Sequence, residues 1–329
     1  TTLVAMSRRR PSGPLLGLAA AAVLGLAAFL AAMAGFLSDP RVAGTPQPTY
    51  TPPRAPAPAG ADQVAELLAA AWTTVAGSAE ADWVWTDQAH WQTMADTLAV
   101  QWRVLTGPDP LGRVEGEGTP GTPVSAPSEA AGVSQADAAL AAVADAAWGH
   151  AAAAAGVESA WWAGLAGAAD QLRYGAAAVY APPQPIDPLA ALAVLPEEAA
   201  FDRLADASHA AVYTASTVLG WLPRDHGWRA TVAGLLDQLR GGRDDLQATA
   251  RANGWAFPTA AAAYAVPPLD DGAAPLAILD QAAAGLAQAA VAWVAAAPPE
   301  HRDQAVAAAR WAAGLSQGHA PAVWFGWPD

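Results

Sequence analysis

Apolar side chains recur at helical spacing through most of the chain. Positions three or four apart share one face of a helix, so this spacing predicts amphipathic helices that each bury one stripe. Residues 61–78, for example, place Val64, Leu68 and Val75 on a single face. No strand-length run of β-branched residues interrupts the pattern, which predicts an all-α fold. The expected helices cover 61–78, 82–105, 134–156 (capped by Ser134), 157–179, 199–222, 227–252, 273–297 and 299–317.

Segments rich in proline and glycine divide these helices into groups. Residues 38–60 form a proline-rich linker, and residues 181–196 form a second linker. Between and after them we expect two antiparallel helical bundles, 61–180 and 197–329. Each bundle contains one long irregular crossover, and that layout is shared by ferritin-like four-helix folds. The pattern leaves open whether the two bundles pack as one unit.

An uncharged run from Pro14 to Leu37 follows three arginines, Arg8 to Arg10. A helix of this length can cross a hydrocarbon layer about 30 Å thick. The arginines would stay on the cytoplasmic side, which sends the rest of the chain outside. Ala32 to Ala34 also supply small residues of the kind a signal peptidase needs. Residues 1–37 are therefore predicted to be a signal peptide or a membrane anchor. The body would be extracytoplasmic, either held at the cell membrane or secreted.

Composition narrows the possible partners. The formal net charge is −14, and all basic residues are arginine. An acidic body repels nucleic acid, so no nucleic-acid partner is expected. The chain has no cysteine, which removes disulfides, thiolate metal sites and cysteine nucleophiles. It also lacks a glycine-rich phosphate loop, a G-x-S-x-G elbow and an H-E-x-x-H pair.

Three sequence features together carry a family resemblance. They are the run from His209 to Tyr213, the pair Arg243-Asp244 followed by Leu246, and an aromatic tail ending in Pro328. On these features, residues 197–329 resemble a family of bacterial ferritin-like domains of unknown function, found in exported proteins of high-GC bacteria. The resemblance implies a four-helix bundle.

This chain departs from the family pattern at two positions. The pattern places a glutamate directly before the histidine of the first feature, and a second histidine about four residues before the Arg-Asp pair. Ser208 and Leu239 occupy those places here. The departures imply that the metal apparatus of a ferritin-like protein is missing.

Asp206 and His209 stand three residues apart on one predicted helix, the spacing of a Glu-x-x-His metal pair. Helix geometry places them roughly 150° from the middle of the apolar stripe. We therefore expect no metal and no cofactor, and a solvated or inter-domain hydrogen-bonded pair. A surface metal site that uses both residues and a further partner remains the alternative. Asp280 is expected on the flank of its helix, outside the interior.

Aromatic and titratable residues suggest further roles. Six tryptophans on apolar stripes are expected in the core: Trp72, Trp91, Trp102, Trp161, Trp228 and Trp293. Inter-bundle packing or partner contact is expected for Trp83, Trp85, Trp162, Trp324, Phe325 and Trp327. The possible interaction surface comprises His209, Tyr213, Trp324, Phe325 and Trp327. Interior packing is expected for His150, helix capping for His226, His301 and His319, and a surface ion pair for Asp170 with Arg173.

These patterns favour a non-enzymatic, exported or membrane-anchored protein of the cell envelope. Its degenerate, metal-free ferritin-like domain would serve interaction or scaffolding, with an envelope protein or a second copy as partner. Residues 14–37 would contact the membrane if they are retained. One alternative is a metal-dependent ferritin-like oxidoreductase or metal-storage protein. Another is a binder of small hydrophobic ligands in a tryptophan-lined cleft.

Overall fold

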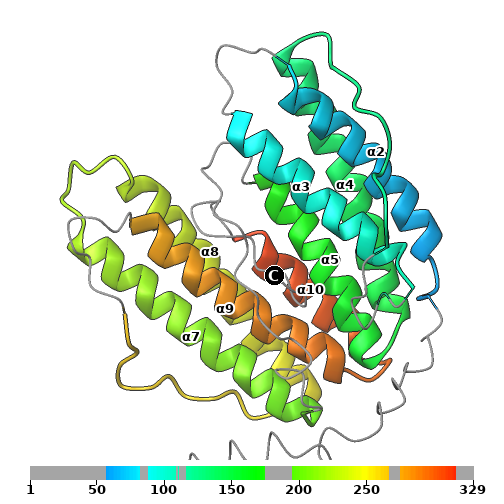
Figure 1. The fold of residues 1–329 in the computed structure, drawn as a ribbon. Coiled ribbons are helices and arrows are strands. Elements are labelled where there is room, and N and C mark those ends of the chain that lie inside the picture. Colours follow the sequence, from blue (N-terminus) through cyan, green and yellow to red (C-terminus); the bar gives the residue numbers. More distant parts are fainter. Residues whose placement is uncertain are drawn as a thin grey trace, which may run out of the picture. The chain divides into compact units, whose positions relative to one another are not determined.

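The fold is all-helical in the part of the chain that the computed structural model describes. That part comprises residues 57–81, 88–108, 110, 116–174, 195–266 and 275–315. Outside it lie the predicted signal peptide or anchor (1–37), most of the predicted linkers 38–60 and 181–196, and the last part of the predicted second bundle (316–329). Trp83 and Trp85 also lie outside it. The described helices are α2 (Ala61–Ala79), α3 (Gln88–Leu105), α4 (Glu129–Ala153), α5 (Gly156–Tyr174), α7 (Glu197–Trp221), α8 (Arg229–Asn253), α9 (Pro275–Ala296) and α10 (Arg302–Ala313) (Figure 1).

Helix α2 packs against both α3 and α4, and α4 packs against α5. The crossover before α4 runs along α2, where the Val124 N–H donates to the Thr73 carbonyl at 3.0 Å. Gly77 makes this approach possible, because a Cβ there would overlap the backbone of Val124. The crossover is therefore held to α2 by main-chain contacts.

Helix α4 begins earlier than predicted. Its N-cap is Ser128, whose hydroxyl accepts the Ala131 N–H at 3.3 Å, so the expected cap at Ser134 is wrong. Gly132 is buried inside the first turns of this helix. Glycine lowers helix propensity, but tertiary packing of the buried face outweighs that cost.

Helices α7 to α10 form a second set, with α7 against α8 and α9, and α9 against α10. A short turn, residues 222–228, joins α7 to α8 (Figure 1). Arg229 closes this turn by donating to the carbonyls of Leu219 and Leu222 at 3.0 and 2.7 Å. These charge-assisted bonds satisfy carbonyls that lack helical partners at the end of α7.

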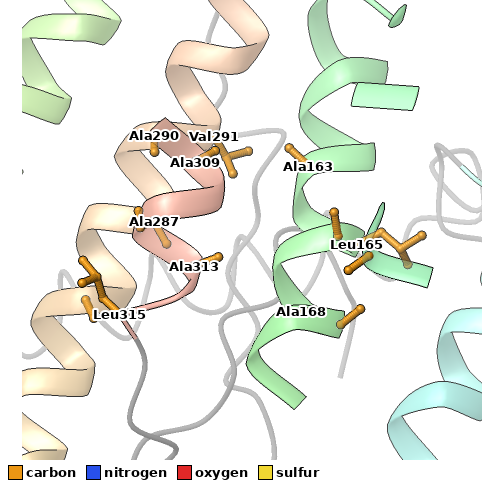
Figure 2. Packing of buried hydrophobic residues seen from close by; sticks show 14 of the residues in the cluster. Ala163, Leu165, Ala168, Ala287, Ala290, Val291, Ala309, Ala313 and Leu315 are labelled. Carbon is orange, nitrogen blue, oxygen red and sulfur yellow. The ribbon is translucent and has the colours of Figure 1, made fainter. Parts of the chain in front are cut away.

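Helix α5 is buried on every side from Ser159 to Leu172, not along the single stripe that was predicted. It contacts α4, and it also contacts α9 and α10 (Figure 2). Small residues allow this close packing, since Gly167 faces the Cβ of Ala313. The helices predicted as two bundles therefore contact each other, since α5 packs on α9 and α10 and α4 also contacts α10.

Helix α9 is the one described helix that is long and apolar enough to cross a membrane. More than half of its most apolar stretch is buried inside the fold. A core helix of a soluble protein has the same length and composition. Its length and composition are therefore weak evidence for membrane association.

Candidate functional site on helix α7

Residues 255–266, which we call the strap, leave the end of α8 and lie against α7. Gly254 ends α8 with a left-handed backbone (φ 73°), a conformation that glycine adopts without strain. The Trp255 N–H then donates to the Ala250 carbonyl at 2.8 Å. This turn directs the strap back towards α7.

Asp206 binds the far end of the strap. Its carboxylate accepts the Tyr264 hydroxyl at 2.9 Å, and that hydroxyl accepts the Ala261 N–H at 3.1 Å. Burial raises the pKa of Tyr264 above its ordinary value of 10.0; the Ala261 N–H bond partly offsets this rise, and the contact with Asp206 adds to it. The neutral phenol is thus favoured in the folded chain. The contribution of Tyr264 is fully present below the ordinary tyrosine pKa and is lost as the pH rises through the folded value.

His209 binds the middle of the strap. Its Nε2 lies 3.0 Å from the Pro258 carbonyl, which can only accept, so Nε2 carries the proton. The Phe257 ring packs edge-on against the imidazole, with ring centroids 5.4 Å apart. Asp206 and His209 therefore both anchor the strap. Within the described ranges, no three side chains of Asp, Glu, His or Cys gather in a way that could hold a metal ion.

Tyr213 continues the same face of α7. Its side chain is 37% exposed, and its ring lies 5.7 Å from that of Tyr264. Of the predicted interaction surface, His209 is thus half covered by the strap and Tyr213 remains open. Trp324, Phe325 and Trp327 lie outside the described residues.

Replacing Tyr264 by phenylalanine should loosen the strap without unfolding the helices. The change removes one hydrogen bond to Asp206 and the acceptor of the Ala261 N–H, at an expected cost of about 1 kcal/mol. Hydrogen exchange should become faster at Ala261 and its neighbours. Tyr213→Phe is the matched control, because it removes a hydroxyl from the same face. Equal exchange rates in the two variants would contradict the role of Tyr264.

A second cluster joins the start of α7 to α9 and α10. Glu197 Oε1 accepts from His301 Nδ1 at 2.9 Å and from Trp293 Nε1 at 3.4 Å. His301 occupies the N-cap position of α10 but makes no side-chain cap, so its predicted capping role is wrong. Its Nδ1 is instead occupied by the hydrogen bond to Glu197 and is not available to cap α10. Glu197 itself gave no signal in the sequence, because an acidic residue in a first helical turn is ordinary.

Phe201 lies one turn further along α7 and is fully buried. Its ring centroid is 5.0 Å from that of Trp255 in the strap and 5.0 Å from that of Trp293 in α9. Phe257 packs on it edge-on at 6.4 Å. Helix α7, the strap and α9 therefore share one aromatic core.

Several side chains lie elsewhere than predicted. Asp280 is 2% exposed and points into the interior instead of the flank. Trp162 is fully buried, stacked on His150 and edge-on to Trp161, which rules out the partner contact and leaves the packing role as the expectation for it. Helices α9 and α10 pack on α5 and cover the face of α5 that the sequence pattern had predicted to lie outside the apolar stripe.

The turn between α7 and α8 reverses another prediction. Trp228 was expected in the core but is 43% exposed, and Trp221 is 46% exposed. Both residues stand at the helix ends that flank the turn. His226 Nδ1 accepts the Trp228 N–H at 3.2 Å, a bond within the turn, because Trp228 is the N-cap residue that precedes α8 and not one of its first helical residues.

Two hollows border the helices of this half. A groove of about 390 Å³ lies between α7 and α9, and Ala265 of the strap closes one side. Small side chains line it, with Thr214 and Gln281 as its polar groups. A smaller pocket of about 250 Å³ lies between α8 and α10. Each is large enough for a small molecule or part of a larger one.

On α7, polar side chains therefore hold the strap in place, and aromatic rings fill the space beneath it. Comparison of the chain with models of protein families, with curated proteins and with solved structures found no match. Function must therefore be inferred from the residues of this chain.

Proposed function

We propose that this chain is a non-enzymatic protein of the cell envelope that acts through interaction or scaffolding. The observation that carries the proposal is the pair of exposed tryptophans, Trp221 and Trp228, at the two ends of the α7–α8 turn. Indole is costly to leave in water and is enriched where proteins meet partners. Arg224 and Asp225 lie between them and are also exposed, which gives the turn a polar rim.

We further propose that α7 to α10 form a ferritin-like bundle without its metal. Ser208 and Leu239 stand where the related family pattern has a glutamate and a histidine, and both are buried here. The Ser208 hydroxyl bonds to the Ala205 carbonyl at 2.6 Å. Positions that could face a metal thus carry side chains suited to an apolar interior, while Asp206 and His209 bind the strap.

The membrane anchor or signal peptide at residues 1–37 and the extracytoplasmic location belong to the same proposal. Their support is the uncharged run after three arginines and the proline-rich linker that follows. Mass measurement of the mature N-terminus separates a retained anchor from cleavage before Gly35.

The purified chain should contain less than about a tenth of an iron, manganese or zinc atom per molecule. Metal binding of the ferritin type needs several inward carboxylates and imidazoles, and Asp206 and His209 are already engaged. Elemental analysis after growth in metal-supplemented medium measures this directly. A stoichiometric content would instead favour the oxidoreductase or storage function, with the buried Asp280 as the first residue to test.

A cross-linking amino acid placed in the α7–α8 turn should capture a defined partner in intact cells. We expect Trp228→p-benzoylphenylalanine to give a discrete cross-linked band in the membrane fraction, with either a second copy or one envelope protein. The band should weaken when Trp221→Ser is added, because that change removes half of the aromatic surface.

Gln238→p-benzoylphenylalanine is the matched control, since Gln238 is exposed in the middle of the same helix. Identical cross-links from positions 228 and 238 would point to random collision. The absence of any band from position 228 would remove the support for an interaction function.

A second candidate function is the binding of a small apolar ligand, and the groove between α7 and α9 favours it. Its lining is mostly alanine, with Ile278 and Leu286 beneath and no charged side chain among its residues. Such a surface binds by apolar burial alone. Titration with hydrophobic dyes, compared between the natural chain and Ala210→Glu, tests it.

A further inference from the structure

The pocket between α8 and α10 combines aromatic and acidic groups, which the groove between α7 and α9 does not. Gly242 forms part of its base, and a Cβ at that position would overlap the indole of Trp311. The missing side chain lets Trp311 lie across α8 and form one wall. Leu246, Ala307 and Ala308 supply further apolar lining, above the buried Trp293.

The pocket is small. Its volume of about 250 Å³ falls below the roughly 300 Å³ at which sites for drug-sized ligands begin. It therefore suits a single ring or a compact branched group. Three polar residues border this space: Asp245, Thr249 and Gln304. The Gln304 amide oxygen already accepts from Asn253 at 3.0 Å.

Asp245 gives the pocket a negative charge, and no arginine of the described residues lies within ion-pair distance of its carboxylate. Arg243 pairs with Asp244 at 2.8 Å, and Arg310 pairs with Asp145 across to α4. Arg240 lies 3.6 Å from Asp237. Arg251 is six residues beyond Asp245 on α8, about 9 Å along the axis. A cation entering the pocket would thus meet a carboxylate beside an indole.

We propose that this pocket binds an organic cation with a compact apolar body, namely a substituted ammonium group. The indole of Trp311 attracts the cation through its π face, and apolar substituents fill the space over Leu246. The Asp245 carboxylate supplies the opposite charge at the rim. This inference does not depend on the interaction function proposed above.

Choline and 3,3-dimethylbutan-1-ol form a suitable pair of probes, because they share one shape and differ in charge. Isothermal titration of the purified chain, supported by saturation-transfer NMR of the probe methyl groups, measures their binding. We expect choline to bind at least about fivefold more tightly than the neutral alcohol. The Asp245→Asn variant should lose most of that preference, and the Trp311→Leu variant should weaken choline binding about tenfold or more.

Asp244→Asn is the matched control, since it removes an adjacent exposed carboxylate that already pairs with Arg243. It should leave choline binding within about twofold of the natural chain. Asp245→Asn changes an exposed side chain, so the test stands even if Trp311→Leu fails to fold. Three results would overturn the proposal. The first is no choline binding at concentrations up to about 10 mM, where a weak specific site would still be detected. The others are equal binding of choline and the neutral alcohol, or equal effects of Asp245→Asn and Asp244→Asn on choline binding.

Discussion

Replacing Phe201 by alanine should destabilise the chain by about 3–5 kcal/mol, the usual cost of deleting a buried aromatic side chain. Phe201 is fully buried, and its ring contacts those of Trp255 and Trp293. The variant would leave a cavity where α7, the strap and α9 meet. Urea unfolding followed by circular dichroism measures the change in the free energy of unfolding.

Two further variants show whether the loss of stability in Phe201→Ala comes from the buried ring. Phe201→Leu keeps most of the volume and should cost about half as much or less. Trp228→Ala removes a larger but exposed side chain and should stay within about 0.5 kcal/mol of the natural chain. A loss below 1 kcal/mol for Phe201→Ala would show that the aromatic core around α7 is not closely packed.

The second large effect is expected from Asp170→Ala, at about 2–4 kcal/mol. Asp170 is buried in α5, where one carboxylate oxygen accepts Trp148 Nε1 at 2.8 Å and the other accepts Arg173 at 3.2 Å. It was expected to form an ordinary surface pair with Arg173. Alanine would leave the buried indole N–H of Trp148 without its acceptor and would remove one carboxylate from Arg173.

Asp137→Ala provides the comparison. Asp137 also pairs with Arg173, at 3.0 Å, but its side chain is 55% exposed, so its loss should cost less than about 1 kcal/mol. Asp170→Asn should fall between the two alanine variants, because the amide oxygen can still accept from Trp148. Thermal unfolding of the three variants gives the order. Equal losses for Asp137→Ala and Asp170→Ala would contradict the buried role of Asp170.

The positions of most described helices could be predicted because they bury a stripe with a period near 3.6 residues. For α7, the expected range of 199–222 compares with Glu197–Trp221 in the structure. The start of α4 could not be fixed in this way. Ser128 and Ser134 both stand in stretches of small residues, and only the backbone shows which of them caps the helix.

The orientation of Asp206 and His209 also followed from the sequence, since the helix pattern turned both away from the apolar stripe. Asp206 is exposed and His209 is half buried, so neither lies in the interior. The hydrogen-bond partners of Asp206 and His209 could not be predicted from the sequence. Pro258 and Tyr264 are 49 and 58 residues further along the chain, and no local period relates a helix to an irregular segment.

The sequence by itself determined the all-helical class and the face that most helices bury, because hydrophobic periodicity acts within one element. Only the tertiary structure decided that α5 is buried all round, that Asp170 and Asp280 are interior, and that Trp221 and Trp228 are exposed. Burial of a given side chain depends on which other elements lie over it. Those elements are distant in sequence, and the physical contact between them is made only when the chain folds.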